Sequence, residues 1–326
     1  MFTHRKDVLH IRVWISMFLL LTLVACAQSP SPAANRPTRT VGSSPTPSLT
    51  SSPISTTLTP PLAKAKTTPT SYTAHLLLRG VGRPDDLAFD QQGRLLFSDE
   101  FNGTISRLNA DGSITRLLTD PSGPEGMVVR PDGTIIFAEQ ETNRVMFLAP
   151  GSSTPLPLRA LPGTPSTVSC KQGTDGIAFD STTNTLIVPD SPTGTVYRMS
   201  LDGKKLTQLA TGIVRPVGAG VDSQGTVFIA DECGGAVWRI TSDGKTTRIG
   251  GFGMPDDVIS DDSGNLLVID LKPSIHALIR FNLETGQRQI LARQGYIEPQ
   301  GLVMDTRGNI FVSDDYANVV MKYVLA

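Results

Sequence analysis

Short apolar runs recur through the chain, and each follows a turn that holds a proline or small residue beside a polar one. This phrase occurs six times, and the copies begin at Pro84, Pro124, Thr174, Pro216, Pro255 and Pro299. Successive copies are 40, 50, 42, 39 and 44 residues apart. Such spacing is the period of a propeller blade rather than of a helical repeat. The pattern therefore predicts six equivalent units around one axis.

The first copy shows how each unit is built. Apolar or alternating runs at 87–89, 94–98, 104–109 and 115–118 are separated by polar turns. Two of the turns in each copy contain glycine, which predicts four antiparallel strands per unit. No stretch of the repeat has the pattern of a helix. The sequence therefore predicts an all-β fold.

The final copy supplies only three strands, at 302–304, 310–313 and 319–324. A fourth is available before the first copy, at residues 73–80, where His75–Gly80 has the composition of an outer strand. Pairing the two ends of the repeat would leave no exposed sheet edge. We therefore expect a six-bladed β-propeller whose N-terminal strand closes the ring by pairing with the last blade.

The first 25 residues have the features of an export signal. Arg5, Lys6 and Arg12 precede a twelve-residue apolar run from Val13 to Val24. A run of that length is short for a membrane span, so it favours a signal peptide. The segment Leu-Val-Ala-Cys that ends at Cys26 resembles the bacterial lipobox. This resemblance implies a lipidated Cys26 and an exported protein anchored on the extracytoplasmic side of a bacterial membrane; the alternative is an ordinary secretory signal in which Cys26 is incidental.

Residues 26–70 predict a disordered tether that begins at Cys26. Of the 44 residues from 27 to 70, 27 are Ser, Thr or Pro, and none is acidic or aromatic. Such a segment cannot bury enough apolar surface to offset its chain entropy. The predicted domains are thus a signal peptide (1–25), a tether (26–70) and the propeller (71–326).

Charge divides the chain at the same boundary. Residues 71–326 hold 22 basic and 29 acidic residues, a net charge of −7. An acidic domain disfavours nucleic acid as a partner and is compatible with a bound cation. No Gly-x-Ser-x-Gly elbow, phosphate loop or closely spaced His and Cys set is present, which argues against a serine hydrolase, a nucleotide enzyme and a zinc site.

Two cysteines remain after Cys26. Cys170 comes just before the third inner strand, and Cys233 lies in a loop of the next blade on the same predicted face. In an exported protein this pair favours a disulfide. Two separate thiols are the alternative.

The repeat resembles a known superfamily. The phrases from Pro84 to Asp90 and from Gly308 to Asp314 look like NHL-type repeats, and the whole of about 75–326 resembles the SMP-30/gluconolactonase propellers. This resemblance implies a divalent cation, often calcium, in the central channel. The implied ligand positions are the residues that start the innermost strands, which here are Asp85, Glu125, Asp175, Val217, Asp256 and Gln300.

Four carboxylates at the mouth of one channel cannot all ionise freely, so either their pKa values rise or a cation neutralises them. Calcium suits such a site because it prefers six to eight oxygen ligands. The alternative is that these side chains only bond the backbone of the neighbouring blade. The set also departs from the family, because Val217 interrupts it and the usual order of Glu and Asn ligands is absent.

A second acidic series ends the second strand of every blade, at Asp99, Glu139, Asp190, Asp231, Asp270 and Asp314. Because it recurs in all six blades, we expect it to accept hydrogen bonds from turn N–H groups. The longest repeat step contains 149–170, rich in Pro and Gly, which predicts a loop over the ligand face. Arg83 and Arg215 precede inner strands and are candidates to orient an anionic substrate; the alternative is that they pair with the neighbouring acids.

Three hypotheses of function follow. The first is a cation-dependent hydrolase of a lactone or related ester, with Asp175 or His276 as general base. The second is a non-catalytic NHL-like module that binds a ligand or protein on the same face. The third is a metal-assisted lyase similar to streptogramin lyases, for which His276 is the available histidine. All three place a small molecule or partner at the channel mouth of a monomer whose membrane contact is the lipid anchor.

Overall fold

The computed structural model describes residues 71–325. The expected signal peptide, the lipidation site Cys26 and the tether lie outside these residues. Strands and turns make up the described part, which contains no helix. No helix long and apolar enough to span a membrane is therefore found between residues 71 and 325.

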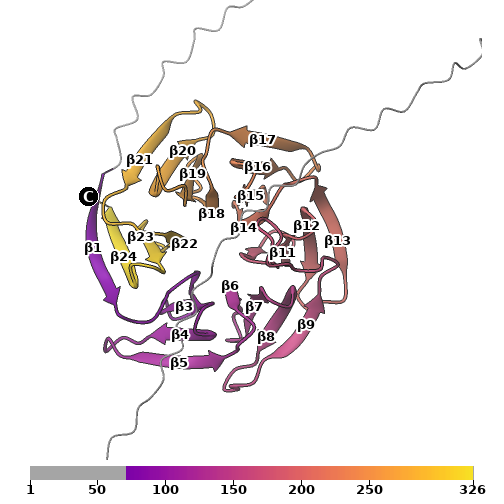
Figure 1. Cartoon of the computed structure of the whole chain (residues 1–326), viewed down its shortest axis with the longest axis vertical. Helices are drawn as coiled ribbons and strands as arrows, with labels where there is room; N and C mark the ends of the chain where they lie inside the picture. The colour runs from indigo at the N-terminus through magenta and orange to yellow at the C-terminus, as the bar shows by residue number, and fades with distance from the viewer. Residues whose placement is uncertain (1–70, 326) are drawn as a thin grey trace, which may run out of the picture. The chain divides into compact units, whose positions relative to one another are not determined.

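Six four-stranded antiparallel sheets surround a central axis (Figure 1). Blades 1 to 3 comprise, in order, β2 (Leu87–Phe89), β3 (Leu95–Asp99), β4 (Thr104–Leu108) and β5 (Ile114–Thr119); β6 (Pro124–Val129), β7 (Ile135–Glu139), β8 (Arg144–Leu148) and β9 (Leu156–Ala160); β10 (Ala178–Asp180), β11 (Thr185–Asp190), β12 (Thr195–Ser200) and β13 (Leu206–Thr211). Blades 4 to 6 comprise β14 (Pro216–Val221), β15 (Val227–Asp231), β16 (Ala236–Ile240) and β17 (Thr246–Gly250); β18 (Pro255–Ser260), β19 (Asn265–Asp270), β20 (Ala277–Asn282) and β21 (Arg288–Ala292); β22 (Pro299–Met304), β23 (Ile310–Asp314), β24 (Val319–Leu325) and β1 (Tyr72–Arg79). The predicted all-β six-bladed propeller is confirmed.

The ring is closed across the two ends of the repeat. β1 pairs antiparallel with β24, with Tyr72 opposite Leu325 and Arg79 opposite Val319, and forms the outer strand of blade 6. Figure 1 shows this strand against the last blade. The closing strand spans 72–79, one residue from the predicted 73–80. No blade is left with three strands, so the expected closure is confirmed.

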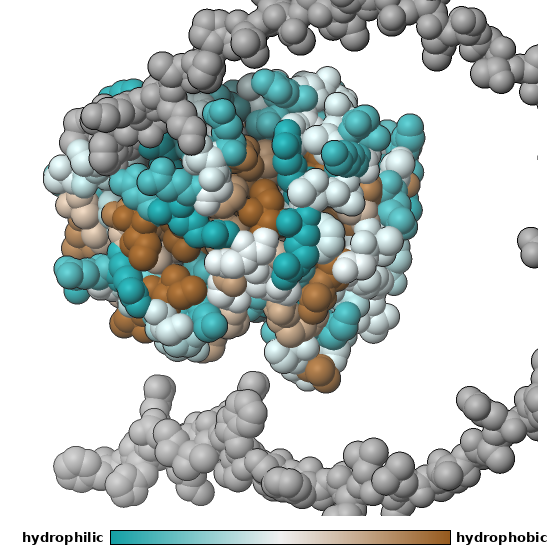
Figure 2. All heavy atoms as spheres, turned by 90° about the horizontal axis from the view of Figure 1, so that it is seen from above, coloured by the Kyte–Doolittle hydropathy of each residue, from teal (hydrophilic) through white to brown (hydrophobic). Residues whose placement is uncertain are grey.

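The core lies between neighbouring blades. In β3, all five residues are buried, because each face of a blade packs on the next blade around the ring. Leu96 packs with blade 2, whereas Phe97 packs with blade 6. Burial on both faces explains why the second strands are continuous apolar runs and not alternating ones. The outer strands carry isolated exposed apolar residues, and Figure 2 shows such residues as separate patches on one flank.

The expected long loop at 149–170 is partly wrong. Residues 156–160 form β9, the outer strand of blade 2, despite Pro157. An outer strand has one free edge, where a proline does not interrupt a hydrogen-bond ladder. The loop over the mouth face is therefore the shorter stretch that follows β9.

Glycines allow neighbouring blades to approach closely at the axis. The third residue of the inner-strand phrase is Gly126, Gly176, Gly218 or Gly301 in four blades. A Cβ atom on Gly126 would lie 2.5 Å from Cα of Gly176, in the next blade. The backbones of adjacent inner strands thus approach so closely that a side chain at this position would collide with the next blade.

We expect Gly126→Ala to destabilise the propeller by about 1–3 kcal/mol, the usual cost of overpacking. The new methyl group would also lie 2.7 Å from Oδ2 of Asp86 and 2.7 Å from the backbone N of Ile177, which cannot move aside. Urea denaturation would measure the loss. The control is Gly250→Ala in β17, where the nearest atom is the flexible end of Arg248; equal losses in both variants would contradict this account.

Candidate functional site

The inner strands of all blades begin at one end of the channel, which we call the mouth. The loop before each inner strand and the first residues of that strand line it. Asp85, Glu125, Asp175 and Asp256 come to this end from blades 1, 2, 3 and 5. The ring thus brings four acids that are far apart in the sequence to one end of the channel.

The tightest cluster joins blades 1 and 2. Carboxylate oxygens of Asp85, Glu100 and Glu125 lie within 4.8 Å of one another. Glu125 is only 2% exposed, and its Oε1 accepts a hydrogen bond of 2.9 Å from Nε2 of Gln140. No donor of the described chain reaches its other oxygen, Oε2. An ionised carboxylate oxygen buried without a donor is costly, so this atom requires either a proton shared with the neighbouring Asp85 or a positive ligand.

Asp175 lies beside this cluster and has basic support. Its Oδ2 accepts hydrogen bonds of 3.3 Å from both Nε2 of Gln140 and Nη2 of Arg215. Arg215 also pairs with Glu232 and is 8% exposed. Gln140 therefore connects Glu125 to Asp175, and Arg215 supplies the nearest positive charge.

The acids of the mouth hold protons more strongly than free carboxyl groups. Burial raises the pKa of Glu125 well above its ordinary value, and the neighbouring Asp85 and Asp175 raise it further. Burial also raises the pKa values of Asp85 and Asp256, and the charge of Asp175 adds to both. For Asp175, burial raises the pKa but Arg215 opposes the rise. Asp175 is therefore the acid of this group best placed to stay ionised.

Two further acids, which the sequence interpretation missed, stand on the axis just below the mouth. Asp86 and Asp257 occupy the position that glycine holds in the other four blades. Asp86 Oδ1 accepts the N–H of Leu87 at 2.6 Å, and Oδ2 of Asp257 accepts the N–H of Leu302, in blade 6, at 2.9 Å. Burial raises the pKa of Asp257 to about 7. The sequence feature that could have identified them is the replacement of this glycine by aspartate in two of the six copies.

The remaining predicted ligands are placed differently. Val217 is fully buried in the apolar cluster of blades 4 and 5, so blade 4 gives the mouth no ligand at this position. Asp256 lies at the start of β18 and does not join the tight carboxylate cluster, and Gln300 lies at the start of β22, at the same end of the channel. His276 lies in the β19–β20 turn with a left-handed φ of 35°, and no hydrogen bond or ion pair within residues 71–325 links its imidazole to the mouth acids.

Glu100 was also not predicted, although it directly follows Asp99, one of the predicted strand-end acids. Five of the six strand-end acids do accept backbone N–H groups, as Asp99 does from Arg83 at 2.8 Å and Asp231 from Arg215 at 3.0 Å. The sixth, Glu139, accepts the hydroxyl of Thr142. The residue after each such acid begins the loop between the second and third strands, at the mouth end of the blade. In five blades that residue is polar, and it is Glu100, Gln140, Ser191, Glu232 or Asp315.

One side of the mouth carries an arginine between two aromatic rings. The guanidinium carbon of Arg83 lies 4.7 Å from the ring centroid of Phe101 and 4.2 Å from that of Tyr316. Its Nη2 pairs with Asp315. Phe101 and Tyr316 are 73% and 55% exposed. We call these three residues the aromatic shoulder.

Large exposed apolar residues in loops gather on the mouth face. They are Phe101, Val168, Val214, Ile297 and Tyr316, each at least half exposed. Within residues 71–325, the other exposed large apolar residues all lie in strands, and the loops of the opposite face carry none. The mouth is thus an acidic well with an apolar rim.

The predicted disulfide between Cys170 and Cys233 is present, with Cα atoms 6.1 Å apart. It joins the loop before Asp175 to the loop that carries Glu232. The covalent link therefore holds together the two loops that support the Asp175–Arg215 pair.

Comparisons with known proteins support the fold. No protein-family model and no curated protein match the chain. Among solved structures, it is similar to a gluconolactonase from Xanthomonas campestris (17% identity, 78% of this chain and 90% of that one, TM-score 0.63). It is also similar to a streptogramin B lyase (16%, 78% and 98%, TM-score 0.60) and to a chain of the nidogen/laminin complex (20%, 70% and 88%, TM-score 0.60). At these identities the likeness shows the six-bladed fold.

Proposed function

We propose that this propeller is a divalent-cation-dependent hydrolase of lactones or related esters that acts at the channel mouth. The observation that carries the proposal is the carboxylate cluster of Asp85, Glu100 and Glu125, in which a buried oxygen of Glu125 has no donor. The similarity to a gluconolactonase supports the choice of substrate class.

The residues fit a hard cation. Three carboxylates supply oxygen ligands of the kind calcium prefers, and the amide oxygen of Gln300 is a further candidate from the same end of the channel. Their combined charge exceeds that of one divalent ion, so binding would offset both the burial and the repulsion from neighbouring acids that raise the pKa of Glu125. When bound, the cation would polarise the substrate carbonyl and lower the pKa of the attacking water.

Asp175 is the general base in this proposal. Arg215 and Gln140 fix its carboxylate, and Arg215 favours its ionised form. Burial nevertheless raises its pKa from the ordinary value, which makes it a better proton acceptor than a surface aspartate. The aromatic shoulder offers two apolar ring faces on which a substrate ring can pack.

We expect Asp175→Asn to lower kcat by about 10²–10⁴-fold, as is usual for loss of a general base. Binding of the cation should persist, since Asp175 lies outside the tight cluster. The measurement is turnover of a lactone and aryl-ester panel with calcium, magnesium, manganese or chelator. His276→Ala is the control and should retain activity; the reverse result for the two variants would overturn the assignment.

A second candidate is a non-catalytic module that docks a partner on the same face. The apolar rim of exposed loop residues favours it, because such residues mark interaction surfaces when they cluster. A calcium-dependent gain in stability without turnover of any ester would favour this function. A lyase would be recognised by turnover in heavy-oxygen water that leaves the products unlabelled.

The expected anchor extends the proposal to location. The lipobox-like segment at Cys26 and the tether to residue 70 support an exported, lipid-anchored protein. The propeller would then meet its substrate outside the cytoplasm. Mass spectrometry of the protein purified from bacterial membranes should find an acylated Cys26 at the N-terminus, and Cys26→Ser should release the protein from the membrane.

A further inference from the structure

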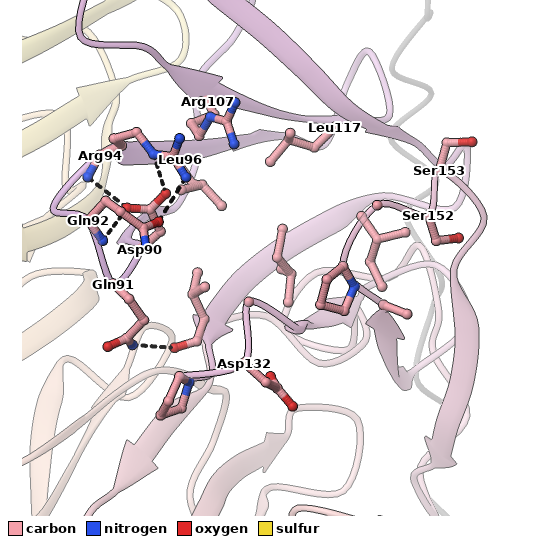
Figure 3. Close-up of a pocket in the computed structure, with 18 of the residues that line it drawn as sticks. Asp90, Gln91, Gln92, Arg94, Leu96, Arg107, Leu117, Asp132, Ser152 and Ser153 are labelled. Atoms are coloured by element: carbon pink, nitrogen blue, oxygen red, sulfur yellow. Dashed lines mark hydrogen bonds and ion pairs between the residues drawn. The ribbon is translucent and has the colours of Figure 1, made fainter.

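A cleft of about 570 Å³ opens between blades 1 and 2, on the face opposite the mouth. Its walls are the β2–β3 turn of blade 1 and the β6–β7 and β8–β9 turns of blade 2, all at the far end of the inner strands. Figure 3 shows Arg94 and Arg107 on one side, Ser152 and Ser153 on another, and Leu117 between them. This volume lies in the range of small-molecule sites.

The floor of the cleft is apolar. Leu96 and Leu148 belong to the core cluster that joins blades 1 and 2, and Leu117 and Val129 pack on that cluster while half-exposed. A register shift in the pairing of β4 with β5 leaves Leu117 without a cross-strand partner. The result is an exposed end of the inter-blade core, which an apolar group can cover.

The basic side of the cleft has charge that the protein does not neutralise. Arg94 is paired, because its Nε lies 2.6 Å from Oδ2 of Asp90. Arg107 donates only to the neutral Oδ1 of Asn109, at 3.1 Å, and forms no ion pair with a described residue. Arg116 also lines the cleft without an ion pair in the described chain. Asp132 also lines the cleft, and its exposed carboxylate is paired with Arg130, with Oδ2 at 3.7 Å from Nη2.

We propose that this cleft binds a small amphiphilic carboxylate, with its head group on Arg107 and its apolar body over Leu96, Leu117 and Leu148. A guanidinium recognises a carboxylate through two parallel hydrogen bonds, and Arg107 has its terminal nitrogens available for them. The site is separate from the mouth and does not depend on the proposed hydrolase activity. In a domain of net charge −7, two unpaired arginines beside apolar floor residues select for an anion with a hydrophobic part.

The test is calorimetric titration of the full propeller with octanoate. We expect saturable binding that Arg107→Gln weakens by roughly tenfold or more, since hydrogen bonds to charged groups contribute strongly. Lys245→Gln, in the exposed β16–β17 turn on the same face but outside the cleft, should bind as the unaltered protein does. Octanol lacks the carboxylate, so we expect the unaltered protein to bind octanol no more tightly than Arg107→Gln binds octanoate.

Three outcomes would overturn the proposal: no saturable binding, equal affinity for octanol and octanoate, or unchanged affinity in Arg107→Gln. Leu117→Ser provides a second variant that removes part of the floor, and it should weaken octanoate without changing the affinity for acetate. Glu125→Gln at the mouth should leave octanoate binding intact, which separates this site from the proposed active site. Crystals soaked with a terminally brominated octanoate should show bromine above Leu117.

Discussion

Without a divalent cation, the stability of the propeller should fall as the pH rises from about 5 to about 8, and calcium should restore it. In the cation-free protein the buried acids of the mouth and axis hold protons that the unfolded chain would release. The pKa of Asp257 is raised to about 7 and that of Glu125 lies well above its ordinary value. The folded state therefore binds more protons than the unfolded one across this range, so the stability present at low pH is lost as the pH rises.

The size of the effect follows from the same shift. For Asp257 alone, a rise from 3.8 to about 7 corresponds to at most roughly 4 kcal/mol, and water in the channel reduces this value. Calcium competes with protons for the carboxylates, so it should stabilise the protein more at high pH. At a hundredfold excess over its Kd, a bound ion contributes about 2.7 kcal/mol, or a Tm increase of roughly 5–10 °C.

Thermal melting with chelator and with calcium at several pH values measures both effects. Glu125→Gln should raise the cation-free stability at high pH, because it removes a buried charge, and should abolish the calcium shift. Glu284→Gln, an exposed glutamate between β20 and β21, is the matched control and should change neither. A Tm that rises with pH in chelator, or a full calcium shift in Glu125→Gln, would contradict the account.

Reduction of the disulfide should produce a loss of similar size. The bridge closes a loop with a sequence separation of 63 residues. In the chain-entropy model such a loop contributes about 4 kcal/mol, which corresponds to a fall in Tm of roughly 8–16 °C for a domain of this size. Melting with and without a thiol reductant tests this, after a thiol count confirms that Cys170 and Cys233 are oxidised.

The double variant Cys170→Ser with Cys233→Ser separates the bridge from other effects of the reductant. Its Tm should equal that of the reduced protein and should not respond to thiols. The loop before Asp175 is also held by Asn143, whose Oδ1 accepts the N–H of Thr174 at 2.8 Å. We therefore expect Asp175 to keep its place, so the variant should retain calcium binding. A variant as stable as the oxidised protein would show that the bridge contributes nothing.

Much of the fold was predictable because the same pattern of strands and turns occurs in six copies. Spacing and glycine turns gave the blades, and the need to cover a free edge predicted the pairing of β1 with β24. The site was only partly predictable. The position of Asp85, Glu125, Asp175 and Asp256 in the repeat predicted that they lie at one end of the channel. Glu100 was not predicted, because only the acid before it recurs in all six blades.

The remaining features depend on the circular arrangement. Glu100 meets Glu125 because blade 1 is next to blade 2, and Asp175 is set apart from the cluster because Arg215 of blade 4 pairs with it. These contacts join residues of different blades, so no local sequence pattern predicts them. Asp86 and Asp257 were detectable from the sequence, because they replace the glycine that the other four copies have at this position. Adjacent inner strands approach closely there, so a larger residue in two copies is unusual.

Calorimetric titration of calcium into the propeller near pH 8, repeated in two buffers of different ionisation enthalpy, tests the central claim most directly. The account predicts one site, release of protons on binding, and loss of the site in Glu125→Gln, because the carboxylates of Asp85, Glu100 and Glu125 must ionise to hold the ion. Absence of binding, or equal binding by Glu125→Gln, would show that the mouth is not a cation site.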